Sequence, residues 1–448
     1  MALSRSRKIL IGVLATTVAL VAGVYAYLAL PSAEYQPYSY GRADREKLPR
    51  MTMVNHESIM RELLGTPSIE VKSIGILVYD GVDTLEAVAP MVVFSELMSV
   101  KLEYVGRRSG IVSSTLADLQ VERSIDEVDQ LDVLIVPGGS RAGIEAMLDD
   151  SNLREWLQRI DGGSKLTAAV GDGSVLLAKA GLLRDRTIAF GWPQGEANAA
   201  ALGSRFVAAQ YTHDDKYWTS VGGAAAIDQS LAMLQAIAGE RHLQAAMLDL
   251  EYDPLPPLRG GTEDTAPPEV LAALAALTWG RDGLTLLDAT PTQHAESQQQ
   301  PLLIGILVYE DFFTLDAIGP LAVLSEIEGA QVRLVRYGDK DEIKSGRTRL
   351  RVATSIADVD NLDLLLVPGG AAGTWAMSKE PAALDWIRAI DAHSRYTASV
   401  CTGSWILGAA GLLKDRKATS NWYRAGQMMA RYGAQFTPQR YVADGKYW

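Results

Sequence analysis

The chain contains one sequence unit twice, and this duplication constrains its fold more than any other feature. Four motifs recur with an offset of 230 or 231 residues. They are IGILVY at positions 74 and 304, LDVLIVPGG and LDLLLVPGG at 131 and 362, AGLLRDR and AGLLKDR at 180 and 410, and YTHDDKYW and YVADGKYW at 211 and 441. A solenoid repeat has a much shorter period, of about 20–50 residues. The repeated unit is therefore a whole domain, and we expect two domains of one fold, copy one and copy two.

Each copy alternates short apolar runs with helical patterns. Copy one has such runs at Ile74–Tyr79, Val133–Val136 and Leu166–Val170, and helical segments such as APMVVFSELM and SVLLAKAGLL alternate with them. Short apolar runs are typical of parallel strands buried on both faces of a sheet. The alternation predicts an α/β fold in which each copy forms a doubly wound parallel sheet with right-handed crossovers.

The N-terminal residues differ from the rest of the chain. A cluster of basic residues at positions 5–8 precedes an uncharged apolar run, Ile9–Leu30. A helix over this run would span roughly 33 Å, enough to cross a bilayer. The run is also longer than the apolar core of a cleaved signal peptide, which is the alternative. We therefore expect a single-pass membrane protein. The leading basic cluster favours extracytoplasmic domains, although more basic residues follow the run.

These features divide the chain into five predicted parts. They are an anchor at residues 1–33, a spacer at 34–71, copy one at 72–258, a linker with a short helix at 259–301, and copy two at 302–448. Copy two stops at Trp448, whereas copy one continues past the equivalent Trp218 with an apolar helix. We therefore expect copy two to be C-terminally truncated, either because the chain is a fragment or because something else covers its sheet.

Composition narrows the range of partners. The net charge of −12 and the pI near 5.0 argue against a nucleic-acid-binding surface. The single cysteine, Cys401, excludes an internal disulfide and a multi-cysteine metal site. No pattern predicts a metal or a cofactor. The expected partners are a small-molecule ligand or substrate and the membrane.

Copy two places chemically distinctive residues after three of its predicted strands. Asp316 follows the first strand, Gly370 follows another, and Cys401 follows the strand at 396–400 and begins a helix. Ligands of open parallel sheets bind beyond the carboxyl ends of the strands, so these residues should converge. A helix N-terminus lowers the pKa of a thiol, which favours a reactive Cys401. The alternative is a buried structural cysteine.

Three segments of copy two resemble the ThiJ/PfpI superfamily, which has the class I glutamine amidotransferase-like fold. They are TASVCTGSWILGAAGLLKDRKAT, LLLVPGG and YEDFFTLDAIGPLAVLSEI. The resemblance covers roughly residues 72–258 and 302–448, and it points to isonitrile hydratase and the sensor domains of AraC-type regulators. It implies flavodoxin-like domains that often dimerise, here within the chain or between chains. It also implies Cys401 as nucleophile and Asp316 as its acid partner. The backbone N–H groups of Gly370 and Thr402 would be the oxyanion donors.

The histidines of related branches are missing. The protease and deglycase-like branches have a histidine at or near the nucleophile, where this chain has Thr402, and many regulator-type relatives have one at the place of Asn421. His393 precedes the strand and should lie near its opposite end. These departures argue against peptidase activity and leave a Cys–Asp pair. We expect that pair to share one proton, as a thiolate beside a neutral Asp316.

Copy one carries a degenerate version of this site. Gly171 stands at the nucleophile position, Glu86 at that of Asp316 and Asp172 at that of Thr402. Glycine adopts the strained backbone of such a turn without steric cost, so the fold can persist without the thiol. The two acids either bind a cationic ligand or simply stabilise the first helical turn.

Two functions remain open from the sequence. The first is a membrane-anchored tandem protein whose Cys401–Asp316 site adds water to a small electrophile, such as an isonitrile or a reactive carbonyl. The second is a non-catalytic sensing or scaffolding protein related to the regulator sensor domains. The missing histidines, the degenerate copy one and the shortened copy two favour the second, whereas the intact Cys401–Asp316 pair favours the first.

Overall fold

The computed structural model describes residues 56–191, 195–258, 261–262, 265–272, 301–370, 372–422 and 424–448. The predicted anchor, with its apolar run Ile9–Leu30, lies outside these residues. In the described part of the chain, no helix is both long and apolar enough to cross a membrane. The longest of them, α8 (Ala225–Ala238), spans about 21 Å, against a hydrocarbon core of about 30 Å. This finding contradicts the expected localisation as a single-pass membrane protein with extracytoplasmic domains, which we do not retain.

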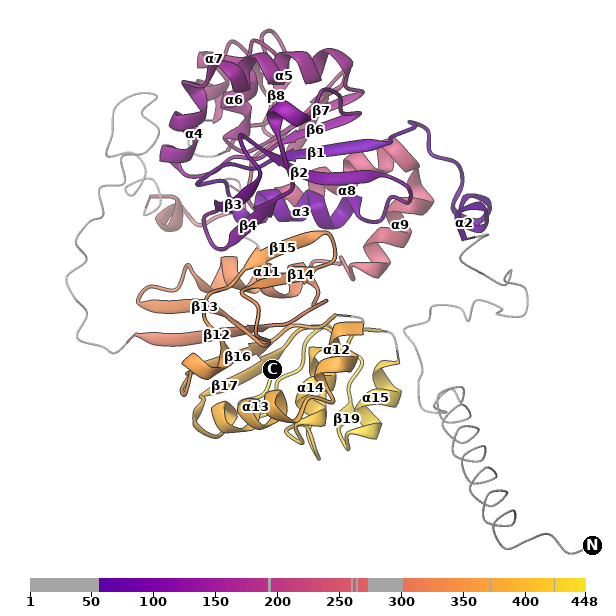
Figure 1. The fold of residues 1–448 in the computed structure, drawn as a ribbon, viewed down its shortest axis with the longest axis vertical. Coiled ribbons are helices and arrows are strands. Elements are labelled where there is room, and N and C mark those ends of the chain that lie inside the picture. The colour runs from indigo at the N-terminus through magenta and orange to yellow at the C-terminus, as the bar shows by residue number, and fades with distance from the viewer. Residues whose placement is uncertain are drawn as a thin grey trace, which may run out of the picture.

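Copy one is built on a largely parallel sheet. In its described residues the strand order is β10-β11-β7-β6-β1-β2-β5, and only β10 and β11 pair antiparallel (Figure 1). Helices cover both faces of this sheet, so the central strands are apolar at nearly every position rather than alternating. The strands are β1 (Ser73–Leu77), β2 (Lys101–Gly106), β5 (Arg123–Ser124), β6 (Val133–Val136), β7 (Leu166–Val170), β10 (Tyr211–Asp214) and β11 (Tyr217–Ser220).

The helices of copy one form two layers. Helix α8 packs against α3 (Thr84–Phe94) on one face of the sheet, and its apolar residues Leu231, Leu234 and Ile237 are buried there. Helix α3 begins after Asp83, whose carboxylate caps it by accepting the N–H of Glu86 at 3.0 Å. The other elements are α2 (His56–Leu64), η1 (Ile125–Glu127), α4 (Arg141–Leu148), α5 (Ser151–Gly163), α6 (Gly173–Lys179), β8 (Thr187–Ile188), α7 (Gly195–Ala201), β9 (Arg205–Phe206) and α9 (Glu240–Asp249).

Copy two repeats the same plan with fewer paired strands among its described residues. Its sheet has the order β13-β12-β16-β17 and is parallel throughout. The predicted α/β fold with parallel sheets is therefore confirmed for both copies. The elements are β12 (Leu302–Val308), α11 (Thr314–Leu324), β13 (Ala330–Arg336), η2 (Ile356–Asp358), β16 (Leu364–Val367), α12 (Ala372–Met377), α13 (Pro381–His393), β17 (Tyr396–Ser399), α14 (Gly403–Ala409), β18 (Lys417–Ala418), α15 (Ala425–Arg431) and β19 (Gln435–Phe436).

The repeated KYW motif has the same structural role in each copy. Tyr217 donates to Asp161 Oδ2 at 2.9 Å, and Tyr447 donates to Asp391 Oδ2 at 3.1 Å. In both copies the lysine before the tyrosine lies 3.1 Å from the other oxygen of that carboxylate. Tyr447 also bridges Thr397 of β17. In each copy the motif therefore links its own segment of chain to a carboxylate at the end of α5 or α13. This structural role explains why the motif is repeated, and no functional site is needed to explain it.

The two copies share a sheet. The hairpin β3 (Gly110–Ser113) and β4 (Asp118–Val121) of copy one lies edge to edge with the hairpin β14 (Glu342–Ser345) and β15 (Thr348–Arg351) of copy two. Strands β4 and β15 pair antiparallel, with Leu119 opposite Leu350. Helices α3 and α11 also pack against each other across the junction of the copies (Figure 1). Tyr104 Oη lies 3.3 Å from Thr348 Oγ1. The copies therefore associate through equivalent elements, as the two halves of a symmetric dimer do.

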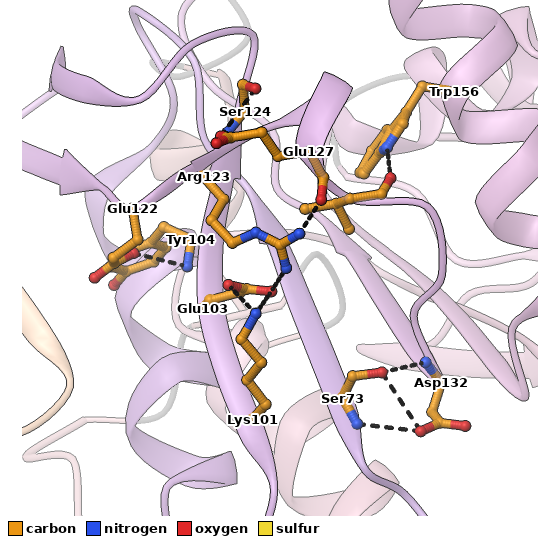
Figure 2. A network of polar contacts seen from close by, with 11 residues as sticks. Ser73, Lys101, Glu103, Tyr104, Glu122, Arg123, Ser124, Glu127, Asp132 and Trp156 are labelled. Atoms are coloured by element: carbon orange, nitrogen blue, oxygen red, sulfur yellow. Dashed lines mark hydrogen bonds and ion pairs between the residues drawn. The ribbon is translucent and has the colours of Figure 1, made fainter.

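A polar network closes the outer edge of the copy-one sheet. Figure 2 shows the buried carboxylate of Glu103 on β2 between Lys101, at 2.9 Å, and Arg123, at 3.0 Å. In the same view Trp156 of α5 donates its indole N–H to the carbonyl of Val128 at 2.8 Å. Each buried polar group in this network has a partner, which is the condition for burying it at low cost. We assign the network to the stability of the edge.

Candidate active site

Cys401 lies in a strained turn between β17 and α14. Its φ is +57°, in the left-handed region that costs a residue with a Cβ on the order of 1–2 kcal/mol. Close packing holds the turn in place, because a Cβ at Gly403 would lie 2.1 Å from the carbonyl oxygen of Val367, at the end of β16. The start of α14 is thus pressed against the sheet, and Cys401 lies half-buried at the carboxyl ends of the strands. The predicted strand-to-helix turn is present.

Asp316, in the first turn of α11, lies beside Cys401. Its Oδ2 accepts the N–H of Gly369 at 2.9 Å, and a Cβ at Gly369 would lie 2.9 Å from the Cβ of Cys401, so the carboxyl and the thiol are neighbours. Only 8 % of Asp316 is exposed. Burial raises the pKa of Asp316 to about 7, and the hydrogen bonds from Gly369 and Cys401 offset that rise only in part. The carboxyl can therefore both accept and release a proton near neutral pH.

The Cys401 thiol holds its proton more tightly than a free cysteine. Burial raises its pKa well above the usual value, and the neighbouring charge of Asp316 raises it further. The backbone N–H and side chain of Thr402 oppose this rise without cancelling it. This reverses the protonation order expected from the sequence, which placed the thiolate beside a neutral Asp316.

A chain of hydroxyl groups lies behind the thiol. Thr402 Oγ1 donates to the carbonyl of Gly370 at 2.8 Å, accepts the N–H of Gly370 at 3.1 Å, and lies 3.1 Å from Thr374 Oγ1. Thr374 Oγ1 in turn lies 3.1 Å from the hydroxyl of Tyr309, which donates to Pro368 at 2.7 Å. The N–H of Gly370, expected to be an oxyanion donor, is therefore bonded to Thr402. The backbone N–H of Thr402, the other expected donor, is one of the groups that lower the pKa of Cys401.

Copy one contributes a residue to this site that sequence reasoning missed. Glu251, just after α9, accepts the backbone N–H of Trp422 at 2.7 Å, and its own carbonyl accepts from Arg440. Its charge raises the pKa of both Asp316 and Cys401, although burial is the larger cause for each. Glu251 precedes Cys401 by 150 positions, and nothing in the residues around it indicates that it reaches copy two. Tyr309 and Thr374 were missed for a similar reason, because a buried hydroxyl has no sequence signature.

The histidine considered from the sequence lies away from the thiol. His393 is exposed and ends α13, which precedes β17, whereas Cys401 follows β17. The two residues are thus at opposite ends of one strand. This arrangement agrees with the absence of a Cys–His dyad at Cys401.

In copy one the longer acid fills the place of the nucleophile. Glu86 accepts the N–H of Gly138 at 2.8 Å and that of Gly223 at 2.7 Å, so both carboxylate oxygens have a backbone donor. Gly171 has a φ of +50°, like Cys401, but a Cβ there would lie 2.9 Å from Glu86 Oε1 and 3.2 Å from the Cα of Gly222. Burial raises the pKa of Glu86 to about 7 and also raises that of Asp172.

This geometry favours the structural interpretation of copy one over the cationic-ligand one. The Glu86 carboxylate is engaged by backbone donors, and the described residues contain no group of three or more His, Cys, Asp or Glu side chains arranged to hold a metal ion. Glu86 therefore fills the space beside Gly171 that a nucleophile's side chain would need, and we call it the plug of the degenerate site.

The duplicated α/β domains, with a cysteine on a strained turn in copy two, agree with the family comparison. The family model described as the DJ-1/PfpI family matches residues 72–236 and 303–448. The chain belongs to the DJ-1/PfpI family. The two matched regions correspond to the two copies, so this DJ-1/PfpI chain is a tandem member.

Similar proteins include enzymes and a regulator. The chain is 38 % identical over 144 residues to an isonitrile hydratase of Pseudomonas putida, covering 32 % of this chain and 62 % of that protein. It is 31 % identical over 144 residues to a deglycase of Thermococcus kodakarensis, covering 32 % and 85 %. It is 43 % identical over 54 residues to an HTH-type transcriptional regulator of Mycobacterium tuberculosis, covering 12 % and 20 %. The chain thus spans less than two thirds of the isonitrile hydratase.

Proposed function

We propose that copy two is a thiol-dependent hydratase for a small, uncharged electrophile, with an isonitrile as the leading substrate class. The observation that carries this proposal is that Asp316 lies beside Cys401, which occupies a strained turn at the strand ends. The similarity to isonitrile hydratase supports the substrate class. The deglycase relative makes a reactive carbonyl the next class to test.

The protonation states suggest the order of events. Near neutral pH the thiol is protonated, and Asp316, with a pKa of about 7, is poised to accept its proton. The sulfur would then attack the terminal isonitrile carbon, forming a C–S bond, while Asp316 passes the same proton to that carbon. The product of this step is a thioimidate, R–N=CH–S–Cys401.

Water completes the reaction and restores the thiol. Asp316 would take one proton from a water molecule as its oxygen bonds to the thioimidate carbon, while the nitrogen gains a proton. The C–S bond then breaks, the sulfur regains a proton, and the product is an N-substituted formamide. The backbone N–H of Thr402, which lowers the pKa of Cys401, would stabilise the negative charge that develops on the sulfur when the bond breaks.

A non-catalytic sensing role is the second candidate. The raised pKa of Cys401 and the plugged site of copy one favour ligand binding over turnover, and the regulator relative is consistent with it. In that case the turn and the Cys401–Asp316 pair would bind the electrophile without releasing a product.

The deciding experiment uses mass spectrometry with the full chain to follow formamide production from a panel of small isonitriles and, separately, the conversion of methylglyoxal as the carbonyl probe. The matched control is Cys401→Gly, which imitates copy one and keeps a residue that accepts the positive φ. We expect turnover in the native chain and none in the variant. Saturable isonitrile binding with no product would instead establish the sensing role.

A further inference from the structure

One acidic residue of copy one, Glu251, contacts the part of copy two that surrounds Cys401. Helix α9 ends at Asp249, and Glu251 follows in the left-handed region with a φ of +47°. The hydroxyl of Tyr252 donates to Asp228 Oδ1 on α8 at 2.6 Å, which fixes this segment to copy one. The carbonyl of Glu251 accepts from Arg440 of copy two. The segment is thus held from both sides at the junction of the copies.

The Glu251 carboxylate supports the loop that lies against Cys401. Its Oε1 accepts the N–H of Trp422 at 2.7 Å. Two residues earlier in that loop, the hydroxyl of Ser420 donates to the carbonyl of Cys401 at 3.4 Å and accepts the indole N–H of Trp405 at 3.0 Å. The loop at residues 420–422 is therefore anchored to Cys401 at one end and to copy one at the other.

The same carboxylate adds negative charge beside the thiol. Burial is the main reason for the raised pKa values of Cys401 and Asp316, but Glu251 raises both as well. Asp316, which bonds Gly369, and Glu251, which bonds the loop against Cys401, therefore place two carboxyl groups around the site. A neutral or cationic electrophile is favoured there and an anionic one is repelled.

We propose that Glu251 of copy one is a positioning and specificity-determining residue of the Cys401 site, holding the 420–422 loop and disfavouring anionic electrophiles. The unit that carries the site is then the pair of copies rather than copy two alone. This inference rests on the proposed function in taking Cys401 as the reacting group. Its test needs no turnover, so the two proposals fail separately.

The test compares two alkylating reagents that differ in charge. Sulfur displaces iodide from either neutral iodoacetamide or anionic iodoacetate, and Cys401 is the single cysteine in the chain. In the full chain, Glu251→Gln keeps an acceptor for Trp422 and removes the charge. We expect the iodoacetamide-to-iodoacetate rate ratio to fall by about threefold or more, and the pH midpoint of alkylation to move down.

Two further variants separate the charge from the hydrogen bond. Glu240 lies in the first turn of α9, the helix that precedes Glu251, and its carboxylate accepts a hydrogen bond from Gln244. Glu240→Gln removes an equal charge there, and it should leave the reagent ratio unchanged. Glu251→Ala should also raise hydrogen exchange of the peptide containing residues 420–422 by about tenfold, since it removes a charge-assisted bond.

An unchanged reagent ratio in Glu251→Gln overturns the proposal, even if Glu251→Ala loosens the loop, because a purely structural anchor would change only the exchange rate. If Glu251→Ala fails to fold, the Glu251→Gln measurement decides the matter by itself.

Discussion

Restoring a cysteine to copy one should destabilise it rather than restore a site. In Gly171→Cys the new Cβ would lie 2.9 Å from Glu86 Oε1 and 3.2 Å from the Cα of Gly222. The backbone itself can accept the change, because Cys401 adopts a φ of +57° at the equivalent position, close to the +50° of Gly171. The main consequence is therefore that Glu86 must move away from its backbone donors.

The size of the effect follows from these contacts. A positive φ costs a residue with a Cβ on the order of 1–2 kcal/mol. Losing one hydrogen bond to the Glu86 carboxylate, from Gly138 or Gly223, costs about 1.5–3 kcal/mol more. We therefore expect the free energy of unfolding of copy one to fall by about 2.5–5 kcal/mol, a large part of the roughly 5–15 kcal/mol of a typical domain.

The assay is urea unfolding of the full chain, with hydrogen exchange in β7 and α6 reporting on copy one. Gly203→Cys is the matched control, because Gly203 has a φ of +74° with no atom within 4 Å of an added Cβ, and it should show only the backbone cost. Shortening the acid in Gly171→Cys with Glu86→Asp should recover about half of the loss. If Gly171→Cys is no less stable than Gly203→Cys, Glu86 is not a plug and our account of copy one is refuted.

The other predictions concern copy two and the repeated network. Burial raises the pKa of Asp316 from 3.8 to about 7, so this carboxyl ionises at a lower pH in the unfolded chain than in the folded one. The free energy of unfolding is therefore highest below pH ~4. It falls as the pH rises towards 7, by up to about 4 kcal/mol. Asp316→Asn should flatten this part of the stability-versus-pH curve, measured by denaturant unfolding, and an unchanged slope would contradict the raised pKa. Thr402→Val removes the hydroxyl that joins Gly370 and Thr374, and should lower stability by about 1–3 kcal/mol while leaving Cys401 available to iodoacetamide. Tyr217→Phe and Tyr447→Phe should each cost about 1–2 kcal/mol, because each leaves a buried carboxylate short of one donor. A large loss of Cys401 alkylation in Tyr447→Phe alone would mean that the network serves the site as well as the fold.

The sequence by itself determined the organisation of the chain and the core of the candidate site. The repeat offset showed two domains, and the apolar runs at 133–136, 166–170 and 364–367 coincide with β6, β7 and β16. Strand identity is a local property here, because a parallel strand buried on both faces must be apolar throughout. The meeting of Asp316 and Cys401 followed from topology, since the carboxyl ends of parallel strands share one edge.

Only the tertiary structure decided how the site is completed and charged. Glu251 reaches Trp422 because the two copies pack together, and contacts between distant segments leave no periodic trace in sequence. Burial raises the pKa of Cys401 more than Thr402 lowers it, and burial depends on everything packed around the sulfur. Likewise, Glu86 has one methylene more than Asp316 at the equivalent position of copy two, and in the sequence this looks like a conservative difference. In the folded chain it places a carboxylate between two backbone donors and fills the space that a nucleophile would need.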